Sequence, residues 1–577
     1  MGVDEPARAP GRRKRPSSDW RHGRPRVILR TKFQRRQRTP KVAPKGDCRD
    51  CLLRSTMREG EDLLPPQLRR GGTRDAPPCL PSVIADEHFL VAHRGISMTH
   101  PGPELPGAYI RLLRSAENEL RTRSQDLKGH MATVEQPLDE QTEPVQPRVL
   151  VHFWRWLGLI TASGFVLRVV VIVLSRHEKV NGDGYEWSAQ GNLNAAGHWF
   201  VSPTTLRPDA LRPPVWAMVL TVWAWFGQHS WLSQQILACI IGSATVLLVG
   251  VCGRRVAGER VGLLAAGLGA VYAGFWVYER AILSETLLLP EIAVFLLLIY
   301  RFRSAPSLRR CAVLGGMCGI MAMTRSEQIL IFPLVVIPAV LGVNWGNWRR
   351  VTTWLVVAIV VLLLVLMPWT IFNLTRFQRP VLLSNGFGPA VASANCQATY
   401  YGPDIGYGEL GCLYPFYGGD QSISDGKYLH NGLSYAEGHS SRVPLVVFAR
   451  EGRTFGFWNP FQQTTIDAQW MGTWVGVSRL EMISYWLLLV PAAIGVVALR
   501  RRRVPLYPLF GFVITVVVAV GTGIGDPRYR AAAEVPLVLL AAAGIDNLMP
   551  GGRGSGQGLE ERQAEIEPKP SSAVVSD

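Results

Sequence analysis

The chain has 577 residues, of which 48% are hydrophobic, and it carries a formal net charge of +17 with a positive mean hydropathy. Most of that charge lies in residues 1–130, which hold 27 Lys/Arg against 15 Asp/Glu and so contribute +12. Because the basic residues are confined to one terminal segment, the net charge does not indicate nucleic-acid binding, and we expect no nucleic-acid partner. Apolar runs of membrane-spanning length recur from Leu157 to Leu548, which predicts a membrane protein in contact with lipid.

The N-terminal segment, residues 1–147, is polar and rich in Pro and Arg, and it shows no pattern that would form a core. This composition predicts a disordered basic region. Such a region could contact anionic lipid headgroups, or the natural start of translation could be Met131, and the residues leave both alternatives open. Cys48 and Cys51 have metal-type spacing but lack a second pair, so no zinc site is expected.

The remaining chain predicts an all-α polytopic membrane protein with about ten transmembrane helices, because a span needs about 20 apolar residues. The expected spans lie near residues 157–175, 231–251, 261–277, 283–300, 311–324, 328–343, 351–371, 482–499, 505–522 and 531–548. The apolar run 213–226 is too short to span and follows two prolines. It is expected to form an interfacial or re-entrant helix, with Trp216, Trp223 and Trp225 as anchors.

Arginines concentrate in alternate short loops, which predicts the orientation of the chain. These loops hold Arg254, Arg255, Arg260, Arg301, Arg303, Arg309, Arg310, Arg349, Arg350 and Arg500 to Arg503. Positively charged short loops stay in the cytoplasm, so both termini are expected there, in a multi-pass protein of the cell membrane. The loops 176–230 and 372–481 then face the extracytoplasmic side.

These spans and loops divide the chain into segments with different expected roles. The expected segments are a membrane core at 148–371 containing the first outer loop 176–230, an extracytoplasmic loop domain at 372–481, C-terminal transmembrane helices at 482–548 and a disordered cytoplasmic tail at 549–577. Cys396 and Cys412 lie in the loop domain, 16 positions apart on the oxidising side. A disulfide there would close a loop worth about 3 kcal/mol, and two buried free thiols are the alternative.

Charged residues recur at the outer ends of the spans. Asp183 lies in a Gly-rich turn in the first outer loop, where it could cap a helix beginning near Tyr185 or present its carboxylate to a ligand. The other outer charges are Glu279, Arg280, Glu285, Arg325, Glu327, Arg376, Arg528 and Arg530. Such residues either extend to the membrane interface or line a polar cavity. Arg168 and Glu291 lie within spans and are expected to face protein.

Several motifs of the membrane region, taken in order, resemble the GT-C integral-membrane glycosyltransferases of the family 39 type. That group includes protein O-mannosyltransferases and the lipid A aminoarabinose transferase. The matching pieces are Gly182-Asp183, Gly191–Phe200, Arg212-Pro213-Pro214, Arg254–Gly258, Glu279–Leu287, Thr324–Glu327, Pro368–Thr370 and Pro527–Arg530. Two departures occur. The family often has two adjacent acids where this chain has Asp183-Gly184, and its Arg-Asn pair after the seventh span is Phe372-Asn373 here.

The resemblance implies transfer of a sugar from a polyprenyl-phosphate donor to a hydroxyl of a glycan, lipid or protein acceptor outside the cytoplasm. Asp183 is the expected catalytic base, with Glu186 or Glu285 as the second carboxylate. The leaving phosphate needs cations, and the candidates are Arg212, Arg325, Arg528 and Arg530. No metal-ligand cluster is recognisable in the sequence, which leaves dependence on a divalent cation open and assigns no other cofactor.

Two other classes of function share some of these features. A polyprenyl-lipid flippase or transporter would also combine about ten spans with charges in a cavity. It should show internal repeats with broken helices at corresponding positions, and no convincing repeat is present. A non-catalytic membrane protein is the other alternative, although it would not need Asp183 and several arginines on one side.

Overall fold

In the computed structural model, the described residues, 152–550, are almost entirely helical. They contain no β-strand, only an isolated antiparallel bridge between Val201 and Pro208. The predicted all-α membrane architecture is therefore confirmed. The expected basic leader 1–147, the alternative start at Met131 and the tail from residue 551 onward lie outside the described residues.

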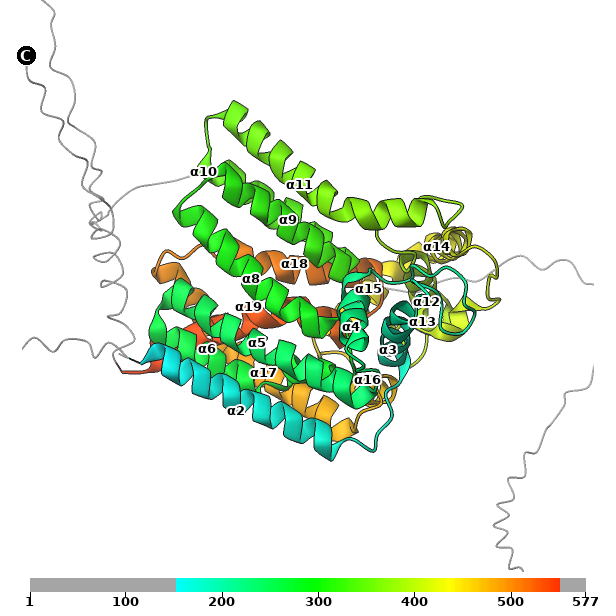
Figure 1. Ribbon diagram of the computed structural model, residues 1–577, viewed down its shortest axis with the longest axis horizontal. Helices are drawn as coiled ribbons and strands as arrows, with labels where there is room; N and C mark the ends of the chain where they lie inside the picture. The colour runs from blue at the N-terminus through cyan, green and yellow to red at the C-terminus, as the bar shows by residue number, and fades with distance from the viewer. Residues whose placement is uncertain (1–151, 551–577) are drawn as a thin grey trace, which may run out of the picture. The chain divides into compact units, whose positions relative to one another are not determined.

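Long helices run alongside one another, and the short helices of the outer loops gather at one end of them (Figure 1). Helices α2, α5, α8, α9 and α11 pack against each other in that order. The long set comprises α2 (Phe153–Leu174), α5 (Trp231–Ala257), α6 (Glu259–Val271), α7 (Ala273–Arg280), α8 (Glu285–Ser304), α9 (Leu308–Thr324), α10 (Ile337–Val343), α11 (Trp348–Leu374), α17 (Val475–Arg501), α18 (Tyr507–Thr522) and α19 (Ala531–Leu548). The short set comprises α3 (Gly182–Ala195), α4 (Val215–Trp225), α12 (Phe387–Ala394), α13 (Gln397–Tyr400), α14 (Gln421–Gly438), α15 (Val443–Thr454) and α16 (Pro460–Met471).

Every predicted span is helical, but the helices differ in whether their length and composition suit a membrane span. By length and composition, six described segments qualify, or seven if the bent pair α6–α7, which turns by 42°, forms one span. Three predicted spans do not qualify. Helix α8 carries four charged residues, and α9 and α18 have only 17 and 16 residues. The span at 326–343 is broken into the 3-10 turn η1 (Ser326–Leu330), the π-helical turn η2 (Phe332–Val336) and α10.

The arginine-rich turns meet at one end of the helices. The Arg255 guanidinium donates to Ser304 Oγ at 2.9 Å, and Arg303 donates to the Tyr507 hydroxyl at 3.2 Å. Arg502 donates to Asp546 at 2.8 Å, near the end of α19. Three predicted cytoplasmic turns and the last helix are therefore joined directly. The opposite ends of the same helices must carry the residues predicted to face outward.

Charges within the helices are buried against protein, as the sequence predicts. Arg168 of α2 is buried and donates to Glu279 at 2.7 Å, and it also contacts the backbone carbonyls of Gly269 and Ala270. Glu291 of α8 is buried and accepts a hydrogen bond from Thr324 at 2.8 Å. Because lipid cannot solvate these groups, their partners lie on neighbouring helices.

Helix α4 is short and apolar, as expected for an interfacial or re-entrant segment, but one predicted anchor is wrong. Trp216 is fully buried, and its indole N–H donates to the Ile282 carbonyl at 3.0 Å. Trp225 is exposed and remains available to an interface. Trp216 instead attaches α4 to the turn before α8, which places the preceding loop next to the candidate site.

Candidate active site

The candidate site begins with the start of α3, which places Asp183 next to the helix core. Helix α3 begins at Gly182 with Asn181 as its N-cap, so Asp183 lies in the first turn and does not cap the helix. Gly184 is needed here because a Cβ at this position would lie 2.0 Å from the Ala281 carbonyl oxygen. This close approach brings Asp183 near the start of α8.

Asp183 and Glu186 share one face of α3, because residues three positions apart in a helix are neighbours. Arg212, in the loop before α4, binds both of them. Its guanidinium lies 2.5 Å from an oxygen of Asp183 and 2.5 Å from an oxygen of Glu186. The Arg212 guanidinium also lies over the Trp187 ring, 5.5 Å from its centre. The first outer loop is therefore folded back on itself by Arg212.

Arg528 binds the second oxygen of Asp183 at 2.8 Å and a carboxylate oxygen of Glu285 at 3.1 Å. It lies in η5 (Pro527–Arg530), the 3-10 turn before α19. The carboxylate of Asp526 accepts the backbone N–H of Arg528 at 2.9 Å and thereby caps this turn. Asp183 is thus held between two arginines that lie at the same end of the helices but come from the beginning and the end of the membrane region in sequence.

Arg325 extends the arrangement further, because it binds the same oxygen of Glu285 and also Glu327. The result is a continuous series of alternating charges, which we call the ion-pair chain. It comprises Glu186, Arg212, Asp183, Arg528, Glu285, Arg325 and Glu327. All seven residues come from loops or from the first two turns of helices at the end opposite the arginine-rich turns.

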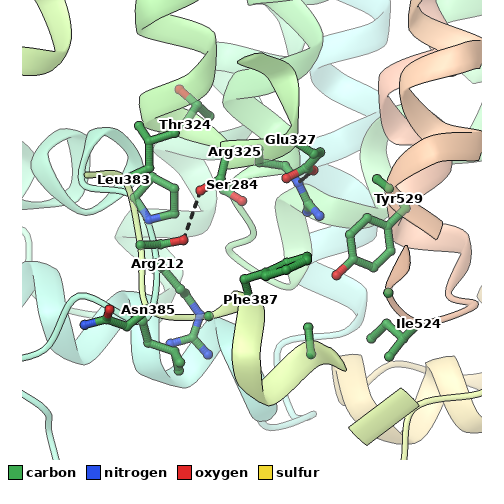
Figure 2. Close-up of a pocket in the computed structure, with 18 of the residues that line it drawn as sticks. Arg212, Ser284, Thr324, Arg325, Glu327, Leu383, Asn385, Phe387, Ile524 and Tyr529 are labelled. Atoms are coloured by element: carbon green, nitrogen blue, oxygen red, sulfur yellow. Dashed lines mark hydrogen bonds and ion pairs between the residues drawn. The ribbon is translucent and has the colours of Figure 1, made fainter. Parts of the chain in front are cut away.

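A cavity of about 670 Å³ lies against the ion-pair chain. Asp183, Arg212, Arg325, Glu327 and Arg528 line one part of it. The segment 380–387 and the outer end of α18 line the rest with mostly apolar side chains. Figure 2 shows Arg212, Arg325 and Glu327 among the lining residues, with the Phe387 ring projecting between them and Tyr529. A volume of this size accommodates a small polar ligand together with part of an apolar chain.

The electrostatics of Asp183 follow from its two partners. Burial raises the pKa of its carboxyl group, but the charges of Arg212 and Arg528 outweigh that effect and hold the pKa well below its usual value. The side chain remains 34% exposed on the cavity side. Asp183 is therefore a fully ionised carboxylate that a ligand can reach.

The other residues predicted for the site take different places. Glu186 and Glu285 belong to the ion-pair chain but do not line the main cavity, and Glu285 is completely buried behind the arginines. Arg530 does not reach the cavity. It is buried among Glu481, Glu534 and Tyr485. Cys396 and Cys412 are joined by a disulfide in the outer-loop helices.

The cavity wall includes polar residues to which the sequence gave no role, among them Glu327, Asn385 and Asp425. Glu327 was noted as an outer charge but given no role, whereas Asn385 and Asp425 lie in the long outer loop, outside every recognised motif. Within residues 152–550, no group of three or more His, Cys, Asp and Glu side chains could hold a metal ion.

The membrane core was compared with known protein families. Residues 211–372 match a family model described as dolichyl-phosphate-mannose-protein mannosyltransferase. The chain carries a domain of the GT-C mannosyltransferase family. The matched segment begins beside Arg212 and ends within α11, so it includes Arg212, Glu285 and Arg325. Asp183 and Arg528 lie outside the mannosyltransferase-family domain, and the folded chain brings them to it.

The chain is also similar to solved structures at low identity. An oligosaccharyltransferase from Archaeoglobus fulgidus in the apo form matches with a TM-score of 0.43 and 14% identity, over 71% of this chain and 52% of that one. The chain therefore spans about half the length of that relative. ArnT from Cupriavidus metallidurans bound to undecaprenyl phosphate matches with a TM-score of 0.36 and 15% identity, over 72% of this chain and 81% of that one. No curated protein matches the chain.

Proposed function

We propose that this protein is a membrane glycosyltransferase that transfers a hexosyl or pentosyl group from a polyprenyl phosphate to a hydroxyl of a cell-envelope glycan, lipid or protein. The observation that carries the proposal is the ionised Asp183 between Arg212 and Arg528 at the wall of a 670 Å³ cavity. The mannosyltransferase-family domain supports the reaction class. The description of the matching family names a dolichyl phosphate, which supports a polyprenyl-phosphate donor.

The reaction joins an acceptor oxygen to the anomeric carbon and breaks the bond between that carbon and the donor phosphate. The leaving oxygen takes the electron pair of the broken bond, so polyprenyl phosphate departs as an anion. Arg212, Arg325 and Arg528 line the cavity and suit this role, because guanidinium groups bind phosphate in a bidentate manner and stay charged. No general acid is then required for the leaving group.

The same arginines determine when Asp183 can accept the proton of the acceptor hydroxyl. A carboxylate bound to two guanidinium groups is a weak base. A donor phosphate that binds Arg212 and Arg528 competes with Asp183 for their N–H groups. Asp183 then loses part of its stabilisation, its pKa rises toward the usual value, and it becomes a better base. Donor binding thus prepares the base for the acceptor.

The orientation belongs to the same proposal, with both termini in the cytoplasm and the cavity on the extracytoplasmic side. Its basis is the meeting of the arginine-rich turns at the other end of the helices. A cysteine at exposed Gly418, where a Cβ meets nothing within 4 Å, should react with an impermeant thiol reagent in intact cells. A cysteine at exposed Arg349 should react only after permeabilisation. The reverse pattern would overturn the orientation.

The activity is tested with the purified full chain and a panel of labelled polyprenyl-phosphate sugars, comparing the wild type with Asp183→Asn and Asp183→Glu. The loss of a general base lowers turnover by about 10²–10⁴-fold, so Asp183→Asn should fall that far without weakening donor binding. Asp183→Glu keeps the carboxylate and should retain more activity. Near-normal turnover by folded Asp183→Asn would end the assignment of the base. Movement of polyprenyl-phosphate sugars across vesicles, without transfer by the wild type, would indicate a flippase.

A further inference from the structure

The cavity wall opposite the ion-pair chain carries three side chains whose interactions are incomplete. They lie in the segment that enters α12 and near the start of α14, and none is part of the ion-pair chain. The three residues are Asn385, Phe387 and Asp425. Each offers a different kind of contact to a ligand in the same cavity.

Asn385 is 4% exposed and lines the cavity, yet its side-chain amide makes no hydrogen bond within residues 152–550. A buried amide without a partner is costly, so its retention at a cavity wall indicates a missing hydrogen-bonding group. The backbone of Asn385 is firmly placed, because its N–H donates to the Ala210 carbonyl at 2.7 Å. This bond also attaches the segment to the loop that carries Arg212.

Asp425 has one carboxylate oxygen in use and one free. Its Oδ1 accepts the backbone N–H of Gly388 at 2.7 Å, whereas its Oδ2 has no partner in the described part of the chain. No arginine or lysine there forms an ion pair with it, in contrast to Asp183, Glu285 and Glu327. Burial raises the pKa of the Asp425 carboxyl group, although the bond from Gly388 opposes the shift. Asp425 is thus an uncompensated hydrogen-bond acceptor at the cavity wall.

Phe387 is 54% exposed and stacks on no other aromatic ring of the described chain. Figure 2 shows its ring projecting from the start of α12 among the lining residues, with Arg212 and Asn385 drawn on one side and Tyr529 on the other. An aromatic ring that could be buried elsewhere is instead presented to the cavity. It provides a flat apolar surface next to the two polar groups.

The three side chains are held as one unit. Gly388 permits α12 and α14 to touch, because a Cβ there would lie 2.1 Å from the Asp425 carbonyl oxygen. The bond between Gly388 and Asp425 then links the residue after Phe387 to α14. Gln421 of α14 accepts from the backbone N–H of Ala210 and donates to Asp209. The wall and the loop of Arg212 are therefore preorganised relative to each other.

We propose that Phe387, Asn385 and Asp425 form the subsite for the transferred sugar ring of the donor, an inference that rests on the proposed function. A sugar ring has an apolar face of C–H groups, which packs on an aromatic ring, and hydroxyls, which both donate and accept hydrogen bonds. The Asp425 carboxylate accepts a hydrogen bond from one sugar hydroxyl, and the Asn385 amide forms a hydrogen bond with a neighbouring hydroxyl. The sugar ring is bonded directly to the donor phosphate. It must therefore occupy the same cavity as the arginines proposed to bind that phosphate.

The test measures equilibrium binding to the purified full chain in lipid nanodiscs. The probes are farnesyl-phosphate mannose, glucose and arabinose, with farnesyl phosphate as the probe that lacks a sugar. Asp425→Asn keeps the bond from Gly388 but removes a charged acceptor, and we expect it to weaken binding of the sugar-bearing probes about 10- to 100-fold. Asn385→Ala should weaken it about 3- to 10-fold. Binding of farnesyl phosphate should change less than about twofold in both variants.

Two further variants control for general effects on folding. Phe387→Ala should weaken the sugar-bearing probes, whereas Phe387→Trp should retain them because it keeps a stacking surface. Glu437 is exposed on the same helix as Asp425, so Glu437→Gln should bind all probes as the wild type does. The melting temperature of each variant is measured without probe, and binding is compared among variants whose melting temperature equals that of the wild type.

Four outcomes are distinguishable. Selective loss of the sugar-bearing probes supports the subsite. Wild-type binding of all probes by Asp425→Asn and Asn385→Ala overturns the subsite and leaves the proposed function standing. Equal weakening of farnesyl phosphate and of the sugar-bearing probes overturns the assignment to the sugar ring. A wild type that binds neither farnesyl phosphate nor its glycosides overturns the proposed function and this subsite with it.

Discussion

Asp183 Oδ2 and Arg528 Nη1 lie 2.8 Å apart, although 345 positions separate the two residues in the sequence. One belongs to the first outer loop and the other to the turn before the last helix. Their contact joins the first outer loop to the turn before the last helix at the wall of the cavity. Since Glu285 also contacts Arg528, a single guanidinium joins α3, α8 and the start of α19.

The position of Arg528 predicts a direct effect on donor binding. Arg528→Ala should weaken binding of a polyprenyl phosphate about 10- to 100-fold, because it removes a charge-assisted contact to the phosphate. Arg528→Lys should have an intermediate effect, since an ammonium group keeps the charge but not the bidentate geometry. Binding of labelled polyprenyl phosphate to the purified protein measures both.

Arg207→Ala is the matched control for Arg528→Ala, because Arg207 is exposed in the same outer region and its side chain forms no ion pair within residues 152–550. It should bind polyprenyl phosphate as the wild type does. Wild-type affinity in Arg528→Ala would show that this arginine only joins Asp183 and Glu285 and does not bind the phosphate.

Arg530 should behave as a structural residue and not as a phosphate ligand. It is 2% exposed, binds Glu481 and Glu534, and lies 3.8 Å from the centre of the Tyr485 ring. Removal of one partner of a buried ion pair costs about 3–5 kcal/mol, because the other charges are left uncompensated. Arg530→Ala should therefore lower the melting temperature and the yield of folded protein.

The folded fraction of Arg530→Ala, isolated by gel filtration in detergent, should bind polyprenyl phosphate with nearly wild-type affinity. A variant with a wild-type melting temperature and a weakened affinity would place Arg530 in the donor site after all.

The disulfide between Cys396 and Cys412 should contribute measurably to the stability of the outer-loop helices. A closed loop of this length is worth about 3 kcal/mol in the chain-entropy account. The Cys396→Ser/Cys412→Ser variant should melt at a lower temperature than the wild type, and reductant should shift only the wild type. Mass mapping without reductant should recover the linked peptides. Full alkylation of both cysteines in native protein would contradict the bridge.

Glu451 of α15 should make stability depend on pH. Burial raises the pKa of its carboxyl group from 4.5 to about 7, although Arg450 opposes the shift, and neither carboxylate oxygen has a hydrogen-bond partner among residues 152–550. The folded state then binds the proton more tightly than the unfolded state. Stability from this group is fully present below about pH 4.5 and is lost as the pH rises toward 7.

The measurement for Glu451 is the melting temperature at pH 5.5 and pH 8. The wild type should melt higher at pH 5.5, and Glu451→Gln should show a smaller difference between the two conditions. An equal difference in both proteins would mean that other groups cause the dependence.

The long apolar helices could be located from the sequence because their signals are local, whereas the short helices α12 to α16 could not. A run of apolar residues must be helical in lipid, where every backbone group needs an internal partner. The arginine-rich turns likewise indicated one common end, which the contacts from Arg255 to Ser304 and from Arg303 to Tyr507 bear out. Of the ten predicted spans, six or seven have the length and composition to cross a membrane; α8 is charged and α18 is short.

The partners of each charge were decided only by the tertiary structure. Arg528 and Arg530 are two positions apart in a motif that suggested one role for both, but η5 is a 3-10 turn, and alternate residues in it point about 120° apart. Arg528 therefore faces the cavity, and Arg530 faces the buried acids. Nothing in the sequence joins Asp183 to Arg528, or Gly388 to Asp425, because these contacts form through helix packing over long separations. The sequence determined which residues lie together at one end of the helices, whereas the packing of those helices determined which of them meet.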